Sequence, residues 1–160
     1  MEPDISLILP HLYLGNYTSS INKRLLDKCN IKHIIRIMPE QFSVKFPNIS
    51  YIQVPIQDEH ICSTNINVCE IIEDLCKYIN YFINKNENIL VHCKRGHHRS
   101  ATVILAYLIK CKYWNITDAI NHIKHIRPYA LRRSTCVFDK LLNTCSKYHY
   151  VYKYKLVRMI

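Results

Sequence analysis

Residues 93–100, CKRGHHRS, place a thiol in front of several cations and an arginine–serine pair. The segment follows the short apolar run ILV and precedes an apolar stretch long enough for a buried helix. A loop between a strand and a helix presents backbone N–H groups and the positive end of the helix dipole to an anion. Such donors stabilise a thiolate at Cys93, and the thiolate is the nucleophilic form of cysteine. The segment therefore predicts nucleophilic attack on an anionic substrate.

The substrate that best fits this loop is a phosphate ester. Arg99 stands six positions after Cys93, where its planar guanidinium can hold two phosphate oxygens and stabilise charge in an in-line displacement. Ser100 can donate a hydrogen bond to the cysteine sulfur, which helps the thiolate to leave in a second step. Gly96 permits a sharp turn between Cys93 and Arg99.

The departing oxygen of such an ester needs a proton, and we expect a carboxylic acid to supply it. Asp58, shortly after the apolar segment YIQVPI, is the candidate, and Glu59 is the alternative. If the strands that precede Asp58 and Cys93 are parallel, their carboxyl ends meet at one edge of the sheet. Both side chains would then reach the same site.

The elements needed to position these residues can be read from apolar periodicity, proline and glycine. The order of elements indicates one α/β domain over residues 1–160, with a mainly parallel central sheet, helices on both faces, and the phosphate-binding loop between a strand and a buried helix. We expect the strands 31–37 and 49–56 to lie centrally. The expected strands are 5–9, 12–14, 31–37, 49–56 and 89–93; the expected helices are a short one ending near Cys29, then 65–83, 100–111, 117–127 with Thr117 as cap, and 134–145 with Ser134 as cap.

The composition excludes several other classes of protein. With two glycines in 160 residues, neither nucleotide-binding glycine motif can be written. No apolar run approaches the roughly 20 residues of a membrane span, and no cationic leader precedes an apolar stretch, so we expect a reducing, cytoplasmic location. The eight cysteines form no C-x-x-C pair, so we expect most of them to be free thiols, with Cys69 and Cys76 filling one helix face.

HCKRGHHRS after ILV resembles the signature of cysteine-based dual-specificity protein phosphatases, especially the compact atypical and viral members. LPHLYLGN at 9–16, VPIQD at 54–58, AYLI at 106–109 and IRP at 126–128 resemble further family blocks in the same order. The resemblance implies a metal-independent, cofactor-free hydrolysis in two steps. Cys93 attacks phosphorus, Arg99 holds the phosphoryl group, and Asp58 first protonates the leaving oxygen and then activates water. His92 would tune the thiolate from behind rather than bind a ligand.

Two activities remain open at this stage, with a phosphate-binding pseudoenzyme as a third possibility. The first is hydrolysis of phosphotyrosine and phosphoserine or phosphothreonine in proteins. The second is an RNA 5′-phosphatase, since a related branch uses the same loop and the net charge of +10 suits an anionic partner. Lys94, Arg95, His97 and His98 could bind substrate, or the two cations could point to solvent and the histidines could fill the loop.

Other polar groups have weaker claims to a function. His122 and His125 are spaced for metal binding, but without a nearby partner we expect them to be surface residues. Arg132 and Arg133 could contact phosphate or be solvated. The tail 148–154, with four tyrosines among basic and apolar residues, could pack on the domain, form a homodimer or contact RNA. If the chain is viral, its location would be the host cytoplasm or the virion.

Overall fold

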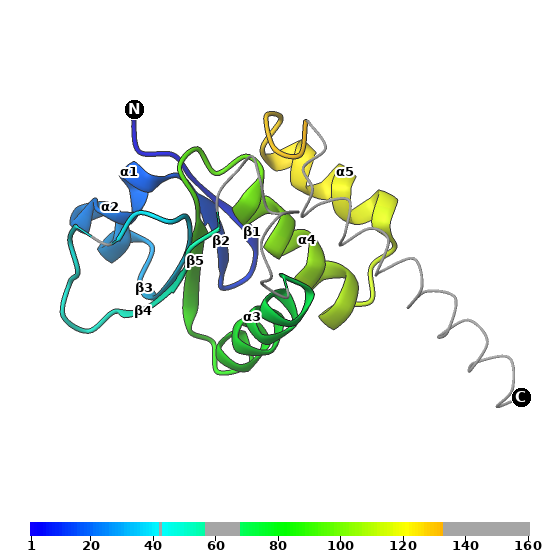
Figure 1. Ribbon diagram of the computed structural model, residues 1–160, viewed down its shortest axis with the longest axis horizontal. Coiled ribbons are helices and arrows are strands. Elements are labelled where there is room, and N and C mark those ends of the chain that lie inside the picture. The colour runs from blue at the N-terminus through cyan, green and yellow to red at the C-terminus, as the bar shows by residue number, and fades with distance from the viewer. Residues whose placement is uncertain (42, 57–67, 133–160) are drawn as a thin grey trace, which may run out of the picture.

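A computed structural model describes residues 1–41, 43–56 and 68–132 and places them in an α/β fold (Figure 1). Within these residues, no helix is both long and apolar enough to cross a membrane. The elements along the chain are β1 (Ile5–Leu9), β2 (Leu12–Gly15), α1 (Tyr17–Ser20), α2 (Lys23–Lys28), β3 (Ile31–Ile37), β4 (Ser50–Val54), α3 (Val68–Ile83), β5 (Asn88–His92), α4 (Arg99–Cys111) and α5 (Ile116–Ile126).

The sheet has the strand order β1-β2-β5-β3-β4. β2, β5, β3 and β4 are parallel neighbours, and β1 pairs antiparallel with β2. The prediction of a mainly parallel sheet is therefore confirmed. The prediction that both middle strands lie centrally is correct for β3 and wrong for β4, which is an edge strand of the described sheet.

The prediction for β4 was wrong for a simple physical reason. Ile52 packs against the large core on the helix-rich face, while Tyr51 packs against the smaller core on the other face. Both faces of the strand are thus covered, which is the condition that an apolar run reports. An apolar run does not indicate whether a strand has one or two hydrogen-bonded neighbours, so it cannot distinguish an edge strand from a central one.

Helices cover both faces of the sheet, as Figure 1 shows: α3, α4 and α5 on one side and α1 and α2 on the other. Alternate residues of β3 face opposite layers, so Ile35 belongs to the large core and Ile34 to the small one. The small core also holds Leu26 of α2 and Leu90 of β5. α4 is buried through its first ten residues, so its amino end is firmly placed against the carboxyl edge of the sheet.

The helix starts differ in detail from the prediction. Asn115, rather than Thr117, caps α5, since its side chain accepts a hydrogen bond from the Asp118 amide at 2.8 Å. The segment before Cys29 contains two short helices instead of one, capped by Asn16 and Asn22. The expected helix from Ser134, the tail tyrosines, Arg133 and the side chain of Cys69 lie outside what the structure describes.

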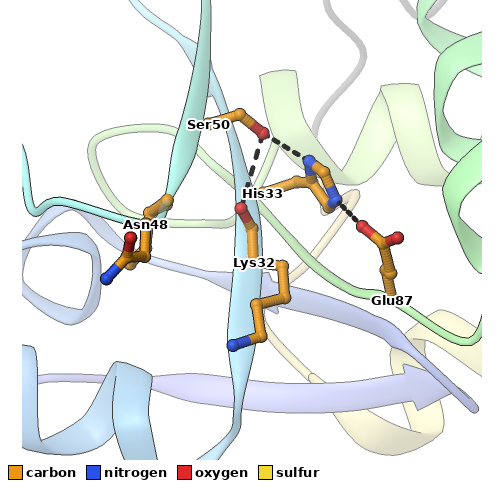
Figure 2. Close-up of a pocket in the computed structure, with 6 residues that line it drawn as sticks. Lys32, His33, Asn48, Ser50 and Glu87 are labelled. Carbon is orange, nitrogen blue, oxygen red and sulfur yellow. Dashed lines mark hydrogen bonds and ion pairs between the residues drawn. The ribbon is translucent and has the colours of Figure 1, made fainter.

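At the amino edge of the sheet, a buried histidine joins several elements (Figure 2). The His33 ring lies between Ser50, to which its Nδ1 is hydrogen-bonded, and Glu87, whose Oε2 is 2.6 Å from Nε2. Nδ1 is also 3.2 Å from the hydroxyl of Tyr78, and the ring packs on Phe82. This cluster lies at the opposite strand ends from Cys93. It connects β3, β4, α3 and the residue before β5, so its role is to fix the sheet.

Candidate active site

Cys93 directly follows β5 and is buried, with 3% of its surface exposed. The Ser100 hydroxyl, in the first turn of α4, donates a hydrogen bond to the Cys93 sulfur at 3.2 Å. The amide groups that open α4 have no acceptor within their own helix and give that end of the helix a partial positive charge. The thiol therefore lies in surroundings suited to a negative sulfur.

Arg99 is held across the loop from the thiol. Its Nη1 donates a hydrogen bond to the carbonyl of Ile56 at 2.9 Å, and only 8% of the residue is exposed. Ile56 lies just beyond β4, and β4 runs parallel to β3, which runs parallel to β5. The expected meeting of strand ends at one edge is thus observed. Asp58 and Glu59 lie outside the described residues, so the identity of the general acid stays a prediction.

Gly96 is fixed in a backbone conformation that disfavours other residues, and no space is left beside it for a side chain. Its φ is +69°, and a Cβ would lie 2.5 Å from the carbonyl oxygen of Gly15 and 3.0 Å from Nη2 of Arg127. The loop is further held by two backbone hydrogen bonds, from the Tyr17 amide to the Lys94 carbonyl at 3.2 Å and from the Leu131 amide to the His97 carbonyl at 2.8 Å. Segments distant in sequence therefore fix the loop from both sides.

Arg127 is a supporting residue that the sequence did not reveal as such. It is 5% exposed, and its guanidinium donates two hydrogen bonds to the Asp4 carboxylate, at 2.9 and 2.5 Å, and one to Ser6 at 3.0 Å. The IRP block at 126–128 was visible as a motif, but its partner near the start of the chain was not. This ion pair packs directly beneath the turn at Gly96.

His92 lies under the loop and is fully buried. Its Nδ1 faces the Cys93 carbonyl, at 3.4 Å, rather than the sulfur. Burial, helped by the positive charge of Arg36, lowers the pKa of His92 to about 3, although the hydrogen bond to the Cys93 carbonyl acts in the opposite direction. The ring is therefore neutral at ordinary pH. Arg36 is itself 1% exposed and packs 5.2 Å from the centre of the Tyr17 ring, another supporting contact that the sequence did not predict.

The four polar loop residues are placed differently from one another. Lys94 and Arg95 are exposed, whereas His97 and His98 are half-buried. The His97 ring stacks on Tyr129, and the His98 carbonyl accepts a hydrogen bond from the Thr102 amide at 2.8 Å. Their roles in substrate binding stay predictions.

The two histidines on α5, His122 and His125, differ in exposure. His125 is exposed, as expected, but His122 is half-buried, because its Nε2 donates to the Ile8 carbonyl at 2.8 Å and its ring packs on Trp114. The four cysteines whose side chains the structure describes are in no disulfide, as expected: Cys29, Cys76, Cys93 and Cys111.

Comparison with known proteins gives one consistent family. Residues 12–143 match the model of the dual specificity phosphatase catalytic domain. The chain is 30% identical to human Dual specificity protein phosphatase 18 over 139 residues, which covers 87% of this chain and 71% of that protein. It is 33% identical to human Dual specificity protein phosphatase 9 over 119 residues, 73% of this chain but only 30% of that protein.

Solved structures agree on the fold. The crystal structure of human DUSP28 superposes with a TM-score of 0.80 at 21% identity, covering 94% of this chain and 97% of that one. The crystal structure of DUSP15 gives a TM-score of 0.78 at 24% identity, covering 98% and 94%. The α/β fold is therefore shared with these structures.

Proposed function

The chain belongs to the dual specificity phosphatase family, and on that premise we propose that it hydrolyses phosphotyrosine and phosphoserine or phosphothreonine in proteins through a phosphocysteine intermediate. The observation that carries the proposal is the 3.2 Å hydrogen bond from Ser100 to the sulfur of Cys93. A hydroxyl that donates to sulfur favours the thiolate, both as the attacking group and as the group that leaves.

In the first step the Cys93 thiolate attacks phosphorus, a sulfur–phosphorus bond forms, and the bond from phosphorus to the ester oxygen breaks. The leaving oxygen takes its proton from the general acid, for which Asp58 is our candidate. In the second step the same carboxylate removes a proton from water, the hydroxide attacks phosphorus, and the thiolate leaves with a hydrogen bond from Ser100. Inorganic phosphate is released, and no electron is transferred.

Arg99 is proposed to hold the phosphoryl oxygens throughout. One guanidinium nitrogen is already fixed by the Ile56 carbonyl, which orders a side chain that would otherwise lose much conformational freedom on binding. The neutral His92 supports the loop without adding a charge that would have to be compensated. A reducing, cytoplasmic location suits a reactive thiol and remains part of the proposal.

The test is turnover on phosphotyrosine and phosphothreonine peptides beside 5′-triphosphorylated RNA, each with and without EDTA. We expect kcat/KM to be higher for the peptides and unaffected by EDTA. Cys93→Ser should abolish turnover while keeping the fold and the binding of vanadate. Arg99→Lys should be severely impaired, because a point charge cannot replace a bidentate group. Substantial turnover by Cys93→Ser would refute the mechanism, and dominant RNA activity would refute the choice of substrate.

The general acid is tested separately. Asp58→Asn should lower kcat on phosphotyrosine peptides by roughly 10²-fold, the usual contribution of a positioned acid, whereas an activated aryl phosphate should lose much less. Glu59→Gln is the matched control and should leave the peptide rate near that of the wild type. The reverse pattern would assign the acid to Glu59.

A further inference from the structure

The turn after α5 is fastened to the catalytic loop. The Leu131 amide donates to the His97 carbonyl, and the Ala130 amide donates to the Arg127 carbonyl at 2.9 Å. Leu131 is buried with a φ of +53°, a conformation that a branched side chain adopts only where the surroundings hold it. Tyr129 and Arg132, on either side of this short segment, are therefore held at the rim of the loop.

Three planar side chains stack at this rim. The rings of His97 and Tyr129 lie 5.9 Å apart between centres with 23° between their planes. The Arg132 guanidinium lies 4.2 Å from the centre of the Tyr129 ring, and its Nε donates to the Pro128 carbonyl at 2.9 Å. We call His97, Tyr129 and Arg132 the stacked rim. Although 60% of Tyr129 is exposed, its contacts order the arginine before any ligand arrives.

The neighbourhood of the stacked rim is strongly positive. Lys94 and Arg95 are exposed in the same loop as His97, and Arg132 is exposed in the turn whose Leu131 amide is bonded to the His97 carbonyl. Burial lowers the pKa of His97, and the positive charges of Arg127, Arg95 and Arg132 lower it further, with Asp4 opposing them. The charge of these arginines is thus felt at one point of the loop. Asp4 is already bound to Arg127 and offers little compensation to the exposed cations.

We propose that the stacked rim, together with Lys94 and Arg95, binds acidic side chains next to the phosphorylated residue, so that the preferred substrates are acidic phosphopeptides. The inference rests on the proposed phosphatase function and adds to it the class of substrate. An ordered guanidinium binds a carboxylate with two parallel hydrogen bonds at little further cost in conformational freedom. His97, Lys94 and Arg95 belong to the loop that holds the phosphoryl group, and the turn that carries Tyr129 and Arg132 is bonded to that loop at His97, so the site would contact residues adjacent to the phosphate.

The same surface is less suited to RNA. Stacking platforms for single-stranded RNA leave an aromatic ring available to the base. The Arg132 guanidinium already lies 4.2 Å from the centre of the Tyr129 ring, so a nucleobase that stacked on that face would have to displace it. Carboxylates instead need guanidinium N–H groups; Arg132 is exposed, and its hydrogen bond to the Pro128 carbonyl is made through Nε.

The experiment compares a phosphotyrosine peptide that carries aspartates on both sides with the same peptide carrying asparagines. We expect kcat/KM to favour the acidic peptide several-fold, mainly through KM, and this preference should shrink when salt rises from about 0.05 M to about 0.5 M. Arg132→Gln should reduce the acidic-to-neutral ratio by about two- to fivefold, as expected for one exposed ion pair. Arg132→Lys, which keeps the charge and loses the planar group, should fall between the two.

The matched control is Lys28→Gln, which makes the same change of charge on α2, on the opposite face of the sheet, and should leave the ratio unchanged. A ratio near one in the wild type, or a ratio that Arg132→Gln and Tyr129→Ala leave intact, would overturn the inference. Tighter binding of single-stranded RNA than of the acidic peptide would also overturn it.

Failure of the inference and failure of the proposed function can be told apart. Hydrolysis of p-nitrophenyl phosphate reports on catalysis without any peptide contact. Peptide affinities of Cys93→Ser, measured by fluorescence anisotropy, report on recognition without catalysis. If the wild type does not hydrolyse the aryl phosphate, the proposed function fails; if it does, and Cys93→Ser binds both peptides equally, only the inference fails.

Discussion

Acidification from about pH 7.5 to about pH 5 should destabilise the protein through His92, because the folded state keeps that ring neutral. The pKa of His92 is lowered to about 3, chiefly by burial and secondarily by Arg36. In the unfolded chain a histidine titrates near 6.5. Between these two pKa values, the His92 ring is therefore protonated in the unfolded state and neutral in the folded state. The stabilisation is present above about pH 6.5 and is lost progressively as the pH falls toward about 3.

The size of the effect follows from the two pKa values. For pKa values of about 6.5 unfolded and about 3 folded, proton linkage gives a loss of roughly 2 kcal/mol at pH 5. That is a large share of the roughly 5–15 kcal/mol that stabilises a typical domain. Urea unfolding at a series of pH values measures it, with wild type and His92→Gln compared at each pH. Glutamine does not titrate and can still donate to the Cys93 carbonyl.

The difference between the two proteins isolates His92, since the other titrating groups are common to both. The variant should lose about 2 kcal/mol less than the wild type over this range. Parallel curves of unfolding free energy against pH would refute the reasoning. So would a proton NMR titration in which the His92 ring signals of the folded protein shift with a midpoint near 6.

Three further predictions concern the loop and a thiol far from it. Gly96→Ala should abolish turnover and vanadate binding, because its Cβ would meet the Gly15 carbonyl; wild-type kcat in this variant would contradict the fit described above. Ser100→Ala should slow the second step more than the first, so a rapid quench should trap phosphorylated Cys93, and an unchanged burst would argue against the hydrogen bond to sulfur. A hydrogen bond from Cys76, with smaller contributions from Lys112 and Lys110, lowers the pKa of Cys111, so alkylation of Cys111 should begin at a lower pH than that of an ordinary thiol, and Cys76→Ala should move its midpoint upward.

The parts of the fold that depend on contiguous residues could be predicted from the sequence. The strand at 31–37 and the loop from Cys93 to Ser100 each carry their whole pattern in one short stretch, and both are found where expected. Strand direction followed as well, because the elements between the strands are long enough for parallel crossovers. Asp58 was predicted from its position shortly after a strand, and the family resemblance implies the same residue, but it lies outside the described residues and stays a prediction.

The supporting residues could not be predicted, because their environments come from distant parts of the chain. Lys32 and Arg36 are both basic residues of β3, yet the lysine is exposed, whereas the arginine is 1% exposed and packs on the ring of Tyr17, which lies outside the strand. From the sequence alone, Arg127 looks like a solvated residue at the end of a helix; only the fold brings Asp4 next to it. The choice of Asn115 over Thr117 as cap is a different matter, because both residues are good caps and local competition decides.

The ion pair between Asp4 and Arg127 also bears on the order in which the protein folds. It joins residues 123 positions apart, and it supports the turn at Gly96. Closing so long a loop carries a high entropic cost, so contacts of this separation form late. Helices α3 and α4 can pack on β5 earlier, through residues that are close in the chain.

Folding intermediates would thus contain both the thiol and Arg99 before the loop between them has its final shape. After dilution from denaturant, recovery of turnover should therefore lag behind recovery of helix, and a chain still being synthesised would carry the reactive cysteine without the means to use it.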